Sequence, residues 1–244
     1  MNKQILSEKN ALITGATGGL GKEIAIELAK KGVNLFITGK QEKKIKKLTE
    51  ELKQKYKNNL IKYQQADLQK NDELNELIKK VHHEFSSIDI LINCAGIFTV
   101  NSLSQNTLEE YDSCMNLNVR APFVLSKEFS KDMIKNKWGR IVNIASSGAY
   151  NGLKNTSIYR SSKHALLGLS RSFYNELKEF NVRTFCFSPG PMKTDMGKDI
   201  INKENPNEEY ETFMEPKEIA EFIVFTISFD NNMMSSEIRL GRMK

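Results

Sequence analysis

The sequence predicts one α/β domain spanning residues 1–244, with a doubly wound, mostly parallel sheet of seven strands and helices on both faces. Short apolar or β-branched runs alternate with longer amphipathic runs along the whole chain, as in proteins whose parallel strands are joined by crossover helices. Runs such as Ile88–Asn93 are almost continuously apolar, which is typical of strands buried on both faces. No repeat, low-complexity linker or change in composition divides the chain.

The predicted strands are short runs bounded by turn residues. They are Ala11–Thr14, Asn34–Thr38, Leu60–Gln65, Ile88–Asn93, Arg140–Ile144, Arg183–Ser188 and Glu237–Leu240. The predicted helices carry apolar residues three or four positions apart. They are Gly19–Lys31, Gln41–Lys57, Asp72–Phe85, Leu108–Ile134, Thr156–Phe180 and Pro216–Phe229. We expect a break near Asn116 in the fourth helix. Pro189–Pro206 has no clear periodicity, and long loops of this kind are usually functional lids or disordered.

The net charge of +6 raises the question of a nucleic-acid partner. Much of the positive charge lies in Lys40–Lys57, where lysines alternate with glutamates and Ile45, Leu48 and Leu52 recur at helical spacing. This pattern predicts a solvated helix face, and no nucleic-acid-binding motif accompanies it. We therefore expect no nucleic-acid partner.

Signals for membranes, secretion and metals are missing from the sequence. No run approaches the roughly 20 apolar residues of a membrane span, and the N-terminus lacks the apolar core of a signal peptide. The three cysteines are widely spaced, and His82 and His83 are adjacent rather than spaced as ligands. These features predict a cytoplasmic protein without a membrane partner and without a metal site.

A glycine-rich turn, Thr14–Gly21, follows the first predicted strand and opens the first helix. Gly15 allows a sharp turn, Gly19 lets backbone approach a pyrophosphate, and Gly21 allows the helix to pack closely on the sheet. The helix N-terminus supplies free N–H groups to an anion. The turn therefore predicts a dinucleotide site. The alternative is a tight glycine turn that binds no ligand, which would have the same sequence pattern.

The end of the second strand bears on the choice of cofactor. An acidic residue there would accept a hydrogen bond from the ribose 2′-hydroxyl of NAD. Ile37–Lys40 contains no acidic residue, and the first one after this strand is Glu42. Lys40 offers a cation to the 2′-phosphate of NADP, and this favours NADP. The alternative is that Lys40 simply begins a lysine-rich helix.

A tyrosine and a lysine, Tyr159 and Lys163, lie four positions apart in a predicted helix and so share one face. A tyrosine has an ordinary pKa near 10, and a nearby ammonium group lowers it by stabilising the phenolate. Ser146 follows the strand Arg140–Ile144 at its carboxyl end, where open α/β sheets bind ligands. This arrangement predicts proton transfer to or from a substrate oxygen.

In their order along the chain, these motifs resemble those of the short-chain dehydrogenase/reductase family, in its single-domain branch, over nearly the whole length. The matching positions are Thr14–Gly21, Asp67, Asn93-Cys94-Ala95-Gly96, Asn118, Ser146, Tyr159, Lys163, Pro189-Gly190 and Thr194. Cys94 replaces the second asparagine of the family's NNAG motif. The resemblance implies a Rossmann fold, a nicotinamide cofactor and a small-molecule carbonyl or alcohol substrate.

The resemblance also implies the site residues. The catalytic residues would be Asn118, Ser146, Tyr159 and Lys163. The cofactor-binding residues would be Gly15, Thr17, Gly19, Leu20, Gly21, Lys40, Asp67, Leu68, Asn93, Ala95, Gly96, Tyr159, Lys163, Pro189, Gly190 and Thr194. Within this set Asp67 would contact the adenine, Thr194 the nicotinamide carboxamide, and Asn118, for which Asn116 competes, a water that links Lys163 to solvent.

The predicted function is that of an NADP(H)-preferring oxidoreductase, with NAD as the alternative cofactor. Tyr159 would act as general acid and base, Ser146 would polarise the substrate oxygen, and Lys163 would hold the nicotinamide ribose. A catalytically silent nucleotide sensor or scaffold of the same fold is the alternative function. The complete set of four catalytic residues argues against it.

The substrate stays open at this point. The middle of the chain resembles 3-oxoacyl-carrier-protein reductases, but Ile97–Glu110 lacks the basic residues that those enzymes commonly carry there for the acidic carrier. The C-terminus lacks their frequent Gly-Gly ending. A ketone, aldehyde, sugar or steroid-like alcohol therefore remains an alternative, and Met192 and Met196 are either pocket or core residues.

Assembly is predicted from two helices. Asn118–Ile134 and Thr156–Phe180 each carry apolar residues on more than one side. In the second helix Leu166, Leu169, Phe173 and Leu177 form one stripe, and Leu167 and Tyr174 lie on another. A helix that is apolar on two faces needs a second partner. With the family resemblance, this predicts a homodimer or homotetramer.

Overall fold

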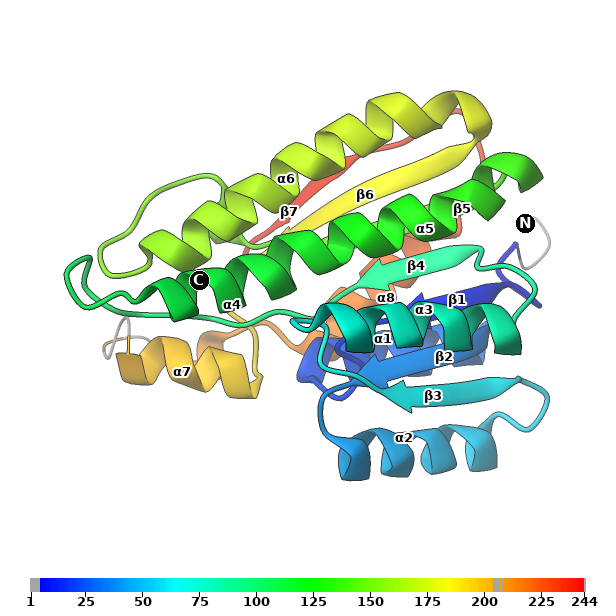
Figure 1. The fold of residues 1–244 in the computed structure, drawn as a ribbon, viewed down its shortest axis with the longest axis horizontal. Helices are drawn as coiled ribbons and strands as arrows, with labels where there is room; N and C mark the ends of the chain where they lie inside the picture. Colours follow the sequence, from blue (N-terminus) through cyan, green and yellow to red (C-terminus); the bar gives the residue numbers. More distant parts are fainter. Residues whose placement is uncertain (1–4, 204–206, 208, 244) are drawn as a thin grey trace.

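A computed structural model describes residues 5–203, 207 and 209–243 (Figure 1). It contains one seven-stranded sheet in the order β3-β2-β1-β4-β5-β6-β7, and all neighbouring strands pair in parallel. The strands are β1 (Asn10–Ile13), β2 (Asn34–Gly39), β3 (Ile61–Gln65), β4 (Ile90–Asn93), β5 (Gly139–Ile144), β6 (Val182–Pro189) and β7 (Glu237–Leu240). The strand order reverses between β1 and β4, which makes the sheet doubly wound, as predicted.

Helices cover both faces of the sheet, which confirms the predicted fold class. They are α1 (Gly19–Lys30), α2 (Glu42–Lys55), α3 (Asn71–Glu84), α4 (Leu108–Met115), α5 (Ala121–Asn136), α6 (Ser157–Leu177), α7 (Asp195–Lys203) and α8 (Pro216–Ile227). One core lies between the sheet and α1, α2 and α8, and a second lies between the sheet and α3, α5 and α6. In Figure 1 the helices α3, α5 and α6 lie in front of the sheet, with α1 and α8 behind it.

The apolar strands divide their side chains between these two cores. In β1, Ala11 and Ile13 belong to the first core and Leu12 to the second. In β4, Ile90 and Ile92 face the first core and Leu91 the second. Because successive side chains of a strand point to opposite faces, a strand covered on both sides must be apolar at every position.

The break that we predicted near Asn116 is a π-helical turn, Asn116–Arg120, between α4 and α5. The helix does not end there, because the turn passes directly into α5, whose second residue is Pro122. Such turns are rare and are often found at functional sites. This one places Asn118, with no exposed surface, on the inner side of the helix.

The prediction of a loop at Pro189–Pro206 was wrong in part, because α7 (Asp195–Lys203) lies within it, while residues 204–206 lie outside the described residues. The Thr194 hydroxyl accepts a hydrogen bond from the N–H of Gly197 at 3.1 Å and so caps the helix. Gly197, which weakens a helical pattern in the sequence, is needed for packing. A Cβ at this position would lie 2.0 Å from the carbonyl oxygen of Met192.

Candidate active site

A cavity of about 580 Å³ lies at the carboxyl ends of the strands. Its walls come from the segments that follow β1, β2, β3, β4, β5 and β6, together with the start of α6 and with α7. The change in strand order between β1 and β4 makes room there, because the chain leaves these two strands in opposite directions. Segments far apart in the sequence thus meet at one site.

The glycine turn forms the floor of the cavity beside β1. Gly15 has φ +65°, and a Cβ there would lie 2.7 Å from the Cα of Ala95. A Cβ on Gly21 would lie 2.2 Å from the carbonyl oxygen of Gly15. The first turn of α1 has no side-chain cap and no acidic residue, so its N–H groups remain available to an anion.

A hydroxyl ties this turn to the neighbouring strand. Thr14 Oγ1 accepts hydrogen bonds from the N–H groups of Cys94 and Ala95, each at 3.1 Å, and donates to the carbonyl oxygen of Ile92 at 3.3 Å. Thr14 is 2% exposed. The segments after β1 and β4 are therefore held as one rigid floor.

An ion pair, Lys40 with Asp67, occupies the end of the cavity beside β2 and β3. Lys40 Nζ lies 2.9 Å from Asp67 Oδ2. Burial of the Asp67 carboxyl raises its pKa, but the hydrogen bonds from Lys40 and from the backbone N–H of Gln69 outweigh burial and hold the pKa below its usual range. The Lys40 side chain is 67% exposed, so its ammonium group faces both Asp67 and the open cavity.

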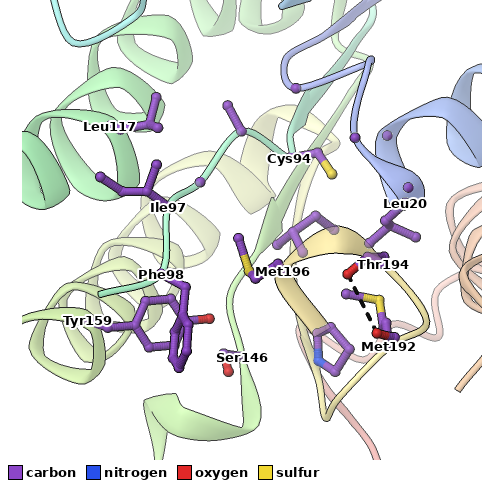
Figure 2. A pocket seen from close by; sticks show the side chains of 18 of the residues that line it. Leu20, Cys94, Ile97, Phe98, Leu117, Ser146, Tyr159, Met192, Thr194 and Met196 are labelled. Atoms are coloured by element: carbon purple, nitrogen blue, oxygen red, sulfur yellow. Dashed lines mark hydrogen bonds between the residues drawn. The ribbon is translucent and has the colours of Figure 1, made fainter. Parts of the chain in front are cut away.

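Tyr159, Lys163 and Ser146 lie at the opposite end. In Figure 2 the side chains of Tyr159 and Ser146 point into the same part of the cavity. Lys163 Nζ lies 5.7 Å from the centre of the Tyr159 ring and donates to the carbonyl oxygen of Ile144 at 2.9 Å. Burial lowers the pKa of Lys163, although that group keeps a polar partner at the end of β5.

Asn118 stands behind this end of the cavity and holds the segment after β4. Its Oδ1 accepts from the N–H of Ile97 at 3.0 Å, and its Nδ2 donates to the carbonyl oxygen of Ile97 at 3.1 Å. The same Nδ2 donates to Ser162 Oγ at 3.0 Å and to Cys114 Sγ at 3.3 Å. The amide thus pairs with Ile97 as a neighbouring strand would.

A family model described as short chain dehydrogenase matches residues 9–205. The chain belongs to this family. It is 34% identical over 195 residues to the 3-oxoacyl-acyl-carrier-protein reductase of Buchnera aphidicola, over 80% of this chain and 78% of that one. It is 31% identical to the reductase of the same name from Rickettsia bellii, over 95% of this chain and 94% of that one.

A solved structure of lower sequence identity shows the same fold. The alcohol dehydrogenase of Thermococcus sibiricus, complexed with 5-hydroxy-NADP, is 26% identical, with a TM-score of 0.85 over 97% of both chains. The family membership makes the present chain an oxidoreductase. Its described helices include none that is long and apolar enough to cross a membrane, and its described residues include no cluster suited to a metal ion.

Two of the predicted site residues in this short-chain dehydrogenase do not line the cavity, Asn93 and Asn118. Asn93 is 2% exposed and donates to Asn143 Oδ1 at 2.8 Å and Ser126 Oγ at 3.3 Å. It therefore ties β4 to β5 and α5 beneath the site rather than facing the expected cleft. The other predicted residues line the cavity: Gly15, Thr17, Gly19, Leu20, Gly21, Lys40, Asp67, Leu68, Ala95, Gly96, Ser146, Tyr159, Lys163, Pro189, Gly190 and Thr194.

Several lining residues were not predicted from the sequence. They include Phe98, Leu153, Arg160 and Ile200, while Met192 and Met196, left open above, also line the cavity. Cys94, which replaces the second asparagine of the family's NNAG motif, also reaches the wall, and burial raises the pKa of its thiol to about 12. The available signal was position, since all of them except Ile200, which lies within α7, follow a strand or lie at the start of α6 or α7 at the carboxyl edge of the sheet.

The segment that carries the two methionines is bonded to the residues just before α8. Met192 forms an isolated parallel bridge with Met214, just before α8. The N–H of Lys193 donates to the carbonyl oxygen of Met214 at 3.0 Å, and the N–H of Met214 donates to that of Pro191 at 3.1 Å. These bonds fix the position of the segment that leads into α7 at the edge of the cavity.

Proposed function

We propose that this enzyme transfers hydride between NADP(H), in preference to NAD(H), and a carbonyl or secondary alcohol, with Tyr159 as general acid and base. The observation that carries the proposal is the meeting of Tyr159, Ser146 and Lys163 with the glycine turn in one cavity. A dinucleotide site and a proton-transfer site are thus continuous, which is what transfer between a cofactor and a bound substrate requires.

The residues present fit a dinucleotide. The glycines of the turn place no side chains where a pyrophosphate would approach the backbone. The uncapped start of α1 offers the pyrophosphate N–H groups and the positive end of the helix dipole. Lys40 would meet a 2′-phosphate at the far end of the cavity. The Thermococcus sibiricus relative was solved with an NADP derivative, which supports the same cofactor class here.

The chemistry follows from the side chains around Tyr159. The bound reduced cofactor would supply a hydride, two electrons and one proton, to the carbonyl carbon. Tyr159 donates its phenolic proton to the carbonyl oxygen, and Ser146 Oγ donates a hydrogen bond to that oxygen as negative charge develops on it. The Lys163 ammonium stabilises the resulting phenolate, which regains a proton from solvent.

The similarity to 3-oxoacyl-carrier-protein reductases supports a 3-oxoacyl thioester as one candidate substrate. The segment that would meet the acidic carrier offers exposed leucines, Leu103 and Leu108, rather than lysines or arginines. We therefore infer that a free carbonyl compound is the better candidate than a carrier-bound one.

Assembly as a homodimer or homotetramer, in the cytoplasm, completes the proposal. Leu167, assigned above to a second apolar stripe, is 3% exposed in the monomer and needs no partner. The support comes instead from Phe123 of α5, which is 42% exposed and stacks on Phe173 of α6 at 6.4 Å between ring centres. Light scattering at micromolar concentration tests the proposed assembly, and a monomer would contradict it.

The cytoplasmic location is supported by the three cysteines, which are all free, as is usual in a reducing compartment.

Tyr159→Phe tests the catalytic proposal, with Tyr174→Phe on the same helix as the matched control. We expect Tyr159→Phe to lose at least about a hundredfold in turnover, the lower range for general acid–base catalysis, while NADPH binding by fluorescence stays near wild type. Tyr174→Phe should keep both. Turnover of Tyr159→Phe above about a hundredth of wild type would contradict the role of Tyr159. NADPH binding without turnover of any carbonyl compound would support a nucleotide sensor instead.

A further inference from the structure

The end of the cavity around Tyr159 is lined by apolar side chains. Phe98 follows β4, Leu153 precedes α6, and Met192, Met196 and Ile200 belong to the segment after β6. Figure 2 shows Phe98 directly in front of the Tyr159 ring, with the two methionines across the cavity. A substrate whose carbonyl oxygen reaches Tyr159 must therefore place its substituents against carbon and sulfur atoms.

The charged groups near this end are already engaged or of the wrong sign for an anion. Arg160 lines the cavity, but its Nε donates to Thr156 Oγ1 at 2.8 Å and its Nη1 donates to the side chain of Asn151. Lys163 donates to the end of β5. Asp195, exposed at the start of α7, adds a negative charge to the wall. A substrate carboxylate would lose its hydration among these apolar side chains, and it would meet Arg160 and Lys163 only in competition with their present hydrogen-bond partners and beside the negative charge of Asp195.

Phe98 lies against the side chain that carries the reacting group, Tyr159. Its ring meets that of Tyr159 edge to face, with 4.8 Å between ring centres and 87° between planes. The backbone behind it is fixed, because Asn118 bonds both the N–H and the carbonyl oxygen of Ile97. Phe98 therefore forms one wall of the cavity beside the phenol, on a segment that Asn118 holds through Ile97.

We propose that Phe98 determines which carbonyl compounds reach Tyr159, and that the substrate is an uncharged ketone or aldehyde with an apolar body, to the exclusion of oxo acids. This inference rests on the proposed function. It assigns Phe98 a role in substrate specificity and none in proton transfer or cofactor binding.

Matched pairs of substrates test it, each pair with the same carbonyl beside an ester or a free carboxylate. Suitable pairs are ethyl acetoacetate with acetoacetate, methyl pyruvate with pyruvate, and methyl 4-acetylbenzoate with 4-acetylbenzoate. For the best pair we expect the wild-type kcat/KM to favour the ester at least about tenfold. Phe98→Ala should raise the KM for the ester about tenfold and change kcat much less. Phe98→Leu keeps an apolar wall, so its KM for the ester should lie between those of wild type and Phe98→Ala.

Two further measurements separate specificity from damage. NADPH affinity by fluorescence should be unchanged in Phe98→Ala, and calorimetry should show weaker binding of the ester to the enzyme with NADP⁺. Phe180→Ala is the control, since Phe180 is an exposed phenylalanine after α6 that does not line the cavity. It should match wild type throughout.

The outcomes distinguish this inference from the proposed function. Equal use of ester and acid by wild type, or an unchanged KM for the ester in Phe98→Ala, overturns the role of Phe98 while the reductase activity stands. Loss of NADPH binding in both Phe98 variants also overturns it, because the residue would then act on the cofactor. A wild type that oxidises NADPH with no member of the panel refutes the reductase activity and this inference together.

Discussion

Replacing Lys40 by glutamine should remove most of the discrimination between NADPH and NADH. Lys40 Nζ lies 2.9 Å from Asp67 Oδ2 and its side chain is 67% exposed. A cation 4 Å from a unit negative charge gains about 4 kcal/mol at an effective dielectric constant near 20. Solvent exposure, salt and competition from Asp67 reduce this gain, since exposed ion pairs contribute only about 0.2–1 kcal/mol and charged hydrogen bonds about 1.5–3 kcal/mol.

A net of about 1.4 kcal/mol corresponds to about tenfold in affinity. We therefore expect the ratio of kcat/KM for NADPH to that for NADH to be about ten in wild type and about one in Lys40→Gln. In Asp67→Asn the ratio should rise, because the competing carboxylate is gone, while any contact to the adenine is lost equally for both cofactors. Steady-state kinetics at two salt concentrations measures this, and higher salt should narrow the wild-type ratio.

Lys53→Gln, at the far end of α2, is the matched control and should leave the ratio unchanged. Gly39→Asp is a poorer test, because a Cβ at Gly39 would lie 2.8 Å from Thr17 Oγ1 and disturb the glycine turn. A wild-type ratio at or below one, or the same ratio in wild type and Lys40→Gln, would refute the assignment of Lys40 to a 2′-phosphate.

Three further predictions concern the floor of the cavity and its buried groups. Gly21→Ala should destabilise the fold by about 1–3 kcal/mol and weaken NADPH binding, because its Cβ would meet the oxygen of Gly15, whereas Gly152→Ala, with open space around it, should do neither in chemical denaturation and fluorescence titration. Burial lowers the pKa of Lys163, so between the folded and ordinary pKa values the unfolded chain binds a proton that the folded chain lacks, and wild-type stability rises with pH. The melting temperature of Lys163→Met, measured relative to that of wild type, should therefore fall from pH 7 to pH 10, and a difference that does not change with pH would contradict this. The same variant should lose turnover, because the ammonium group beside Tyr159 is gone. Because burial raises the pKa of Cys94 to about 12, native enzyme should form roughly a thousandfold less thiolate there than an ordinary cysteine does, and iodoacetamide at pH 8 should label Cys94 only after denaturation, by mass spectrometry.

The sheet and most helices could be predicted from the sequence because their patterns follow directly from burial. A strand covered on both faces must be apolar throughout, as in β4, and this holds without knowledge of its neighbours. Helix α7 could not be found in the same way. Its glycine, Gly197, disfavours a helix locally, and the reason for it is the carbonyl of Met192, a contact that exists only in the folded chain.

The candidate site shows the same division. Motif spacing predicted the residues that form the cavity floor, since a glycine turn works through its own backbone. Side-chain direction was not predictable, and Asn93 therefore turned out to bond Asn143 inside the sheet rather than face the cleft. Phe98 was missed because a phenylalanine after a strand is ordinary in sequence. The role proposed for Phe98 rests on its contact with the Tyr159 ring, and the order of residues along the chain does not show which side chains come into contact.

The bridge between Met192 and Met214 has a consequence for how the enzyme can diverge. Much of the wall opposite Phe98 comes from one continuous segment that ends in α7, and this segment joins the rest of the protein at that bridge and at the end of β6. No residue of the segment pairs Lys40 with Asp67 or anchors Lys163 to β5. Substitutions that accumulate in this stretch at residues other than Thr194 can therefore alter the range of accepted molecules while Tyr159, Lys163 and the glycine turn are inherited unchanged.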